Sequence, residues 1–225
     1  MSLRFFPVFA MALSLVLGLA TSARPQDGPP SATPLGRSWD AAYLEDKPSF
    51  TLEPSTFLVD VVNGLKPGAA LDVGMGQGRN ALFLAKQGWT VTGFDVSRVG
   101  IEQARAQAQK AGLTLTTVLA TDAEFDWGTN RWDLIVVAYF PQLRRSMARI
   151  VASLKPGGVV VVEAYHADAA LDRSPGPGPG VTYQANELPT LVAPLRVLRY
   201  EEPRARADWG LYETRLVRLL AQKRP

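Results

Sequence analysis

Three glycines and two carboxylates stand close together in the first half of the chain, in a pattern that can bind a nucleotide-like ligand. Gly74, Gly76 and Gly78 alternate with larger residues directly after an apolar run that ends at Asp72. Only a residue without Cβ combines positive φ with close approach of the backbone to a ligand. Asp95 follows about twenty residues after the first glycine and can accept hydrogen bonds from two ribose hydroxyls.

The elements that must position these residues can be predicted from the hydrophobic pattern. The apolar run that ends at Asp72 is typical of a buried strand, and a helical pattern follows the glycines and stops at Gly88. A second β-rich run, 89–94, ends at Asp95. Strand, glycine turn, helix, strand and acid in this order make half of a nucleotide-binding α/β unit.

Two ligand classes use such a unit, dinucleotides and S-adenosylmethionine. A dinucleotide site has glycines spaced G-x-G-x-x-G, so that a helix N-terminus meets the pyrophosphate. Here the spacing is G-x-G-x-G, and Arg79 fills the third dinucleotide position. Asp72 would repel a pyrophosphate but suits the cationic, zwitterionic methionine end of S-adenosylmethionine.

The stretch Leu71-Asp-Val-Gly-Met-Gly-Gln-Gly-Arg-Asn80 resembles motif I of the class I S-adenosylmethionine-dependent methyltransferases, most closely their tellurite-resistance-type branch. The resemblance covers residues 37 to 223. It implies an α/β, Rossmann-like, three-layer sandwich with a mostly parallel sheet and a C-terminal antiparallel hairpin. It implies S-adenosyl-L-methionine as cofactor, with contacts at Asp72, Gly74, Gly76, Gly78, Asn80, Asp95, Val96, Asp122, Ala123 and Ala138.

The later elements follow the same order. Ser97 is expected to cap a helix over 98–111, and strands are expected over 113–119, 132–138 and 159–164, the last after a Pro-Gly-Gly turn. The resemblance places Asp122 on the adenine amino group and the Ala123 N–H on a ring nitrogen; a helix cap or turn is the alternative for Asp122. A short helix near 186–188 and two strands over 195–202 and 212–220 complete the chain.

Candidate catalytic residues are Tyr139 and His166, each at the expected carboxyl end of a strand, where ligands bind in open α/β sheets. His166 is the only histidine, and an imidazole can accept a proton or steer a charged group near neutral pH. The alternative is an ordinary loop histidine. Four arginines could bind an anionic acceptor: Arg79, Arg144, Arg145 and Arg173. The alternative is that each is a solvated surface charge.

The N-terminal part divides into two segments before the domain at 38–225. Residues 1–23 combine a basic start, a long apolar run and small residues, as in a signal peptide or an uncleaved membrane anchor. They predict export or membrane tethering; a mis-assigned start codon would instead leave the protein in the cytoplasm. Residues 24–37 are rich in Pro, Gly and Ser and are expected to form a flexible linker. Beyond them, Trp39 and Tyr43 could cover the cofactor or only one end of the sheet.

Composition narrows the class of partner. The chain has 24 basic and 21 acidic residues, interspersed and without the Lys/Arg stripe of a nucleic-acid surface, so we expect a small-molecule methyl acceptor and no nucleic acid. Cysteine is absent, which excludes disulfides and a cysteine nucleophile. No metal is expected, and the oligomeric state stays open. An NAD(P)-binding oxidoreductase and a non-catalytic S-adenosylmethionine-binding module are the alternative functions.

Overall fold

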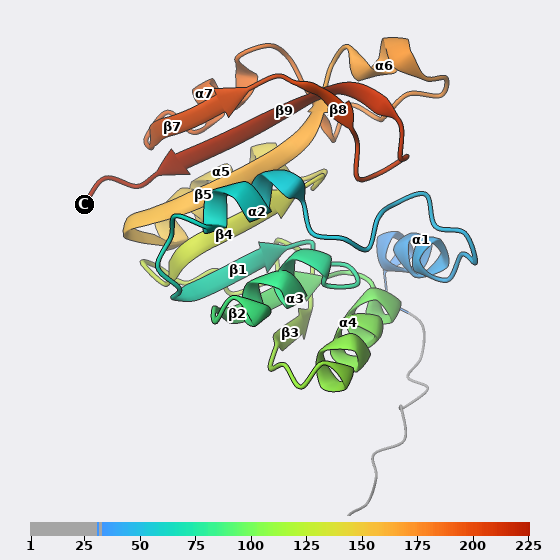
Figure 1. Cartoon of the computed structure of the whole chain (residues 1–225), viewed down its shortest axis with the longest axis horizontal. Helices are drawn as coiled ribbons and strands as arrows, with labels where there is room; N and C mark the ends of the chain where they lie inside the picture. Colours follow the sequence, from blue (N-terminus) through green and yellow to red (C-terminus); the bar gives the residue numbers. More distant parts are fainter. Residues whose placement is uncertain (1–30, 32) are drawn as a thin grey trace, which may run out of the picture.

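Five adjacent strands of a nine-stranded sheet run parallel, starting from the edge strand β3, and place their carboxyl ends along one edge of the sheet (Figure 1). The computed structural model describes residue 31 and residues 33–225. The strand order is β3-β2-β1-β4-β5-β9-β7. The parallel strands are β1 (Ala69–Val73), β2 (Thr90–Asp95), β3 (Thr116–Leu119), β4 (Trp132–Ala138) and β5 (Leu154–His166). This arrangement confirms the predicted Rossmann-like sheet.

Helices cover both faces of the sheet, so its inner strands are apolar almost throughout. One face packs against α2 (Thr56–Val62), α3 (Arg79–Lys86) and α4 (Arg98–Lys110), through buried residues such as Leu58, Leu84 and Ala104. The other packs against α5 (Leu143–Ser153) and α7 (Glu187–Leu191), through residues such as Ile150 and Leu188. The three layers of the expected sandwich are thus present.

The C-terminal part adds the predicted antiparallel pair. Strand β9 (Glu213–Gln222) pairs antiparallel with β5 and with β7 (Arg196–Glu201). Three short elements were not apparent in the hydrophobic pattern: α6 (Ala169–Asp172), β6 (Thr182–Tyr183) and β8 (Arg204–Arg206). They position the loops that border the carboxyl edge beyond β5. Within the described part of the chain, no helix has both the length and the apolar run needed to cross a bilayer.

The N-terminal boundary differs from the expected linker over 24–37. Helix α1 (Pro34–Tyr43) begins inside that range, because the Thr33 side chain accepts a hydrogen bond from the Gly36 N–H and proline is favoured at the first helical position. Ser31 is also buried and donates to Asp40 through its N–H (3.0 Å) and its hydroxyl (3.1 Å). The predicted signal peptide or anchor, residues 1–23, lies outside the described residues.

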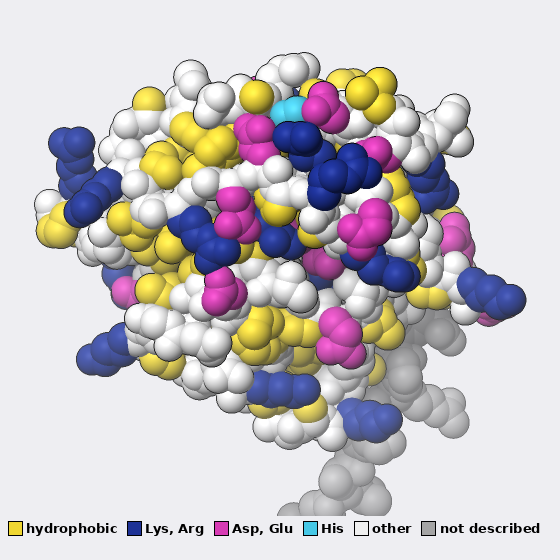
Figure 2. All heavy atoms as spheres, turned by 45° about the horizontal axis from the view of Figure 1, so that its top comes forward, with side chains coloured by type: hydrophobic (Ala, Val, Ile, Leu, Met, Phe, Trp, Pro, Cys, Tyr) yellow, Lys and Arg dark blue, Asp and Glu magenta, His cyan; other side chains and the backbone are white. Residues whose placement is uncertain are grey.

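Charges on the face shown in Figure 2 are mixed: Lys and Arg side chains lie among Asp and Glu, and no broad area carries one sign. The interspersed pattern in the sequence therefore corresponds to an interspersed surface on this face. An area of one sign is what the phosphate backbone of a nucleic acid requires.

Candidate active site

A cavity of about 290 Å³ runs along the carboxyl edge of the sheet, from β3 to β5. We call its two parts the β2–β3 half and the β4–β5 half. The β2–β3 half is lined by Asp95, Val96, Thr121, Asp122 and Arg145. The β4–β5 half is lined by Trp39, Tyr139, Phe140, Tyr165, Val181 and Trp209. Gly74, at the end of the central strand β1, lies on the cavity wall between the two halves.

The glycine turn after β1 has the backbone conformation that the sequence pattern requires. Gly74, Gly76 and Gly78 have φ of +65°, +52° and +79°. Residues that carry a Cβ rarely adopt these backbone angles. A Cβ on Gly74 would lie 2.8 Å from the Phe140 ring, and one on Gly76 would overlap the Tyr43 hydroxyl. The turn therefore offers bare backbone to the cavity, as close approach of a ligand demands.

Asp95 joins this turn to the end of β2. Its Oδ2 accepts a hydrogen bond from the Gly76 N–H (2.9 Å) and its Oδ1 from the Ser97 N–H (2.7 Å). Only 6% of the residue is exposed, and burial raises the pKa of its carboxyl group. Asp95 lines the cavity beside Val96, where its remaining lone pairs can accept from hydroxyl groups. The residue thus both holds the turn and faces the cavity.

Asp72 lies one step deeper, beside a small hollow of about 30 Å³ that it lines with Gly76, Arg79 and Asn80. This hollow shares Tyr43, Gly74, Ala138 and Trp209 with the main cavity. The Asp72 Oδ2 accepts a hydrogen bond from the Ala81 N–H (3.0 Å). Burial raises the pKa of the Asp72 carboxyl group to about 7, although the positive charge of Arg79 acts to lower it. A cationic ligand group in the hollow would stabilise the ionised form. Asn80 uses its Oδ1 to accept from the Ser55 N–H (3.0 Å).

Asp122 lines the cavity as the sequence pattern suggests, but its carboxylate is already bound by α5. Arg145 donates to both oxygens (2.9 and 2.5 Å) and the Ser146 hydroxyl to Oδ2 (2.9 Å). Burial alone would raise the Asp122 pKa, but these contacts hold it below its usual value. Arg145, which was a candidate for binding an acceptor, therefore fixes Asp122. Ala123 is exposed and is absent from the cavity lining.

Four aromatic residues from distant segments meet over the cavity, and we call them the aromatic cover: Trp39, Tyr43, Phe50 and Trp209. The Trp39 and Trp209 rings meet edge-on with centroids 5.5 Å apart, and those of Phe50 and Trp209 are 4.4 Å apart. Trp39 and Tyr43 line the same cavity as Asp95, so α1 contributes to the wall of this cavity. The sequence analysis did not single out Phe50 or connect Trp209 with this site.

Tyr139 follows β4 and lines the β4–β5 half with Ala138 just before it. Its φ of +55° is uncommon for a non-glycine residue and turns the ring into the cavity wall, edge-on to Tyr165 at 5.0 Å. The Tyr139 hydroxyl accepts from the Asp208 N–H (3.2 Å), and the Tyr165 hydroxyl donates to the Trp209 carbonyl. Burial raises the pKa of both phenols. Both are therefore neutral at physiological pH.

His166 lies on the other side of this strand end, away from the cavity lining. Its Nδ1 accepts from the Asp168 N–H (3.0 Å), and its Nε2 is 3.8 Å from the Glu202 carboxylate. It is 5% exposed. Because side chains alternate along a strand, Tyr165 faces the cavity and His166 does not. The structure thus brings the glycine turn, Asp95, Asp122 and Tyr139 to one cavity and leaves His166 outside it.

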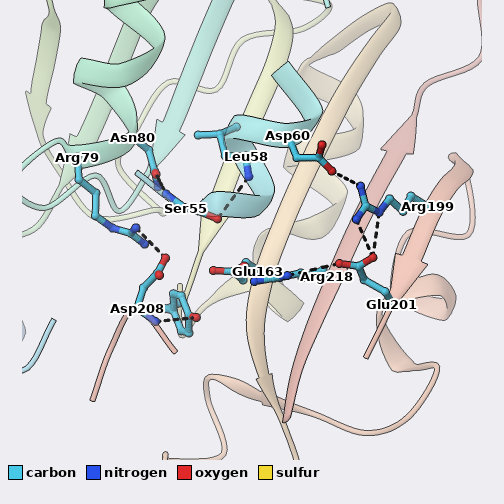
Figure 3. A network of polar contacts seen from close by, with 11 residues as sticks. Ser55, Leu58, Asp60, Arg79, Asn80, Glu163, Arg199, Glu201, Asp208 and Arg218 are labelled. Carbon is cyan, nitrogen blue, oxygen red and sulfur yellow. Dashed lines mark hydrogen bonds and ion pairs between the residues drawn. The ribbon is translucent and has the colours of Figure 1, made fainter. Parts of the chain in front are cut away.

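A network of polar contacts includes the ion pairs of Arg79 and Arg218 (Figure 3). Arg79 donates to the Asp208 carboxylate (2.7 Å) and to the Glu53 carbonyl (2.9 Å). Arg218 pairs with Glu163 at 2.7 Å, and the Glu163 side chain is only 3% exposed. The Arg79 pair connects the start of α3 to the segment between β8 and β9, and the Arg218 pair connects β9 to β5.

The comparisons with known proteins agree with this geometry. Residues 70–158 match the family model described as a methyltransferase domain. Over 133 residues the chain is 32% identical to the ubiquinone biosynthesis O-methyltransferase of Vibrio parahaemolyticus, which covers 55% of this chain and 55% of that protein. The chain spans about half the length of the curated relatives it matches.

Solved structures share the fold. TehB from Haemophilus influenzae superposes with a TM-score of 0.64 at 24% identity, covering 74% of this chain and 61% of that one. The N-methyltransferase NodS from Bradyrhizobium japonicum, solved with S-adenosyl-L-homocysteine, gives a TM-score of 0.63 at 20% identity, covering 84% and 97%. Residues 70–158 thus match a methyltransferase domain, and the fold around them is that of the class I S-adenosylmethionine-dependent methyltransferases.

Proposed function

We propose that the chain transfers the methyl group of S-adenosylmethionine to a small-molecule acceptor. The observation that carries the proposal is the single cavity that joins the bare glycine turn and the Asp95 carboxylate to an aromatic chamber at β4 and β5. When bound, the cofactor supplies a methyl group activated by a sulfonium. A donor site and an acceptor site in one cavity are what direct transfer requires.

The residues present fit this cofactor. Asp95 has the position and free lone pairs for the ribose hydroxyls, and Asp72 the negative charge for a cationic methionine end. Gly74 lines the cavity and Gly76 the adjoining hollow, so the backbone of the turn borders the space proposed for the cofactor. Val96 and Asp122 border the region left for the adenine, with Arg145 holding Asp122 in place.

The chain contributes mainly orientation and exclusion of water. Holding two reactants in line can remove about 7–11 kcal/mol of an activation barrier. The aromatic cover and Tyr139 form apolar walls around the reacting region, and water excluded there cannot compete for the cofactor. Of the two candidate catalytic residues, we assign contact with the acceptor to Tyr139, since His166 is outside the cavity lining.

Calorimetry with S-adenosylmethionine, S-adenosylhomocysteine and NAD(P) tests the cofactor. Binding of a dinucleotide but of neither sulfur ligand would favour the oxidoreductase alternative. Transfer of labelled methyl to a panel of small acceptors then separates an enzyme from a binding module.

Asp95→Ala is the matching variant for the binding site. Removing the charged acceptor should weaken cofactor binding by roughly 1.5–3 kcal/mol per lost hydrogen bond. Because Asp95 also holds the Gly76 N–H, the variant should lose stability as well, and its melting temperature must be measured beside its affinity. Asp126→Ala, at a side chain 87% exposed, is the control.

For residues 1–23 we propose export or membrane tethering, supported by their basic start, long apolar run and small residues. Cell fractionation and N-terminal sequencing of the isolated protein test this. Cleavage near residue 23 supports a signal peptide, and an intact N-terminus in the membrane fraction supports an anchor. An intact N-terminus in the soluble cytoplasmic fraction contradicts both.

A further inference from the structure

The β4–β5 half of the cavity differs chemically from the β2–β3 half. The charged side chains among the described lining residues are Asp95, Asp122 and Arg145, all in the β2–β3 half. The β4–β5 half is formed by Trp39, Tyr139, Phe140, Tyr165, Val181 and Trp209, which carry no charge. An acceptor in this half therefore meets aromatic and aliphatic walls.

The arginines that could have received an anionic acceptor have other partners. Arg79 binds Asp208, and Arg145 binds Asp122. Arg144 donates to Glu187 (2.6 Å) and to the carbonyls of Pro179 and Thr182 (3.1 and 2.7 Å). Arg173 donates to the Gly210 carbonyl (3.2 Å) and lies over the Tyr212 ring. An anion in the β4–β5 half would lose its hydration with no paired cation in return.

A proton acceptor is also missing from the described lining of this half. Besides the indoles, its polar side chains are Tyr139, Tyr165 and Gln142; both phenols are buried and neutral, and an amide does not act as a base near neutral pH. The nearest carboxylates have partners of their own, Asp208 with Arg79 and Glu163 with Arg218. Alcohols and phenols react well only after losing a proton, so this half suits a nucleophile that needs no base.

On these grounds we propose that the β4–β5 half selects a small, planar, uncharged acceptor whose nucleophile is a neutral aromatic-ring nitrogen. The inference rests on the proposed methyl transfer. In the step, the nitrogen lone pair forms the new N–CH₃ bond while the S–CH₃ bond breaks. Both electrons of that bond go to sulfur, which leaves as a neutral thioether, and no proton moves. The positive charge passes from sulfur to the ring.

The aromatic walls fit both ends of this step. Flat rings pack against the side chains of Trp39, Tyr139 and Trp209, and the face of an aromatic ring attracts the cation that forms. The step moves one positive charge from the sulfur to the acceptor ring and leaves the total charge unchanged. The protein therefore needs no additional counter-ion in this half of the cavity. The same walls disfavour carboxylates, oxyanions and thiolates.

Isoquinoline and isoquinoline-carboxylate form a suitable acceptor pair, identical except for the anionic group. With saturating labelled S-adenosylmethionine, we expect isoquinoline to be methylated with at least tenfold higher kcat/KM than the carboxylate. Thiophenol and 2-naphthol are tested alongside and are expected to react more slowly than isoquinoline. A preference for the carboxylate, the thiol or the naphthol overturns the proposal.

A binding measurement decides the question even if turnover is slow. Titration of the S-adenosylhomocysteine complex with N-methylisoquinolinium, the methylated product, should give at least tenfold tighter binding than with isoquinoline-carboxylate. Trp209→Leu should reduce that ratio, and Trp209→Phe should keep most of it, each measured at a concentration of S-adenosylhomocysteine that saturates the variant. Equal binding of cation and anion overturns the proposal.

Different results would contradict the methyltransferase function and the proposed class of acceptor. If neither sulfur ligand binds the protein, the methyltransferase function itself fails. If both bind but the acceptor pair shows no preference or the reverse preference, only the acceptor class fails. Melting curves of both Trp209 variants verify that they are folded.

Discussion

Arg79 and Asp208 are separated by 129 positions in the sequence, and their side chains form an ion pair at 2.7 Å (Figure 3). Arg79 begins the helix after the glycine turn, and Asp208 directly precedes Trp209 on the cavity wall. The Asp208 N–H donates to Tyr139 and its carbonyl accepts from the Thr51 N–H (2.9 Å). The ion pair thus joins the start of the helix after the glycine turn to the segment that carries Trp209.

A double-mutant cycle with Arg79→Ala and Asp208→Ala measures this pair. Both side chains are mostly buried, at 12% and 14% exposure, so each single variant leaves a charge with little solvent or partner. We expect a coupling energy of about 1–3 kcal/mol in urea denaturation. The exposed pair Arg131–Asp126 serves as control and should give about 0–1 kcal/mol. Equal coupling for the two pairs would contradict a special role for Arg79 and Asp208.

Gly76→Ala should damage both stability and cofactor binding. The strained φ alone costs about 1–2 kcal/mol, and the new Cβ also meets the Tyr43 hydroxyl. Gly112→Ala is the matched control, because Gly112 has a similar φ of +66° and open space around it. We expect similar strain in both variants, but at least tenfold weaker binding of S-adenosylhomocysteine only in Gly76→Ala. Unchanged affinity in a folded Gly76→Ala variant would place the cofactor elsewhere.

Asp72→Asn should change how stability depends on pH. The folded-state pKa of Asp72 is raised from 3.8 to about 7, so the native protein retains a proton that the unfolded chain loses. Asp72 therefore lowers stability progressively as pH rises from about 4 to about 7, by at most about 1.4 kcal/mol per pH unit. Relative to the wild type, Asp72→Asn should become more stable across this window.

Asp133→Asn supplies a control of opposite sign. Burial would raise the Asp133 pKa, but Lys155 and the Ala69 N–H hold it below its usual value. Its contribution to stability is present above the unfolded pKa and is lost as pH falls through the folded value. Relative to the wild type, Asp133→Asn should thus be destabilised at neutral pH and recover in acid. Parallel pH curves for the wild type and Asp72→Asn would contradict the raised pKa.

His166→Ala should leave methyl transfer within about twofold of the wild-type rate, because His166 does not line the cavity. It should lower stability by about 0.5–3 kcal/mol, since the ring is buried beside Asp168 and Glu202. Initial rates across pH and thermal melting measure the two effects. A loss of 10²–10⁴-fold, with one limb of the pH–rate profile missing, would instead restore a catalytic role for His166.

Local sequence patterns were enough to predict the centre of the fold. Apolar runs, caps and stop glycines such as Ser97 and Gly88 depend on neighbours within a few positions, so β1, α3, β2 and α4 were predicted within a few residues. The positive φ values of the glycine turn follow equally from residue type. The two-residue strand β6 and the single-turn helix α6 are too short to show a period.

The rest of the site depends on contacts between distant segments, which a single sequence does not reveal. Nothing local in the sequence indicates that Arg145 binds Asp122, or that Phe50 packs on Trp209 across 159 positions. The orientation of His166 was missed for a simpler reason. The strand end was predicted, but which of Tyr165 and His166 faces inward depends on where the strand leaves the sheet.

The aromatic cover also bears on the order and timing of events at the site. Trp39 and Tyr43 belong to α1, and Trp209 belongs to the connection before β9, so rings from two distant segments meet at the cavity that Asp95 and Gly74 line. A ligand seated against the glycine turn cannot exchange until the rings separate. We therefore expect the cofactor to bind first and its by-product to leave last. The dwell time of the by-product, rather than the transfer itself, would then limit turnover.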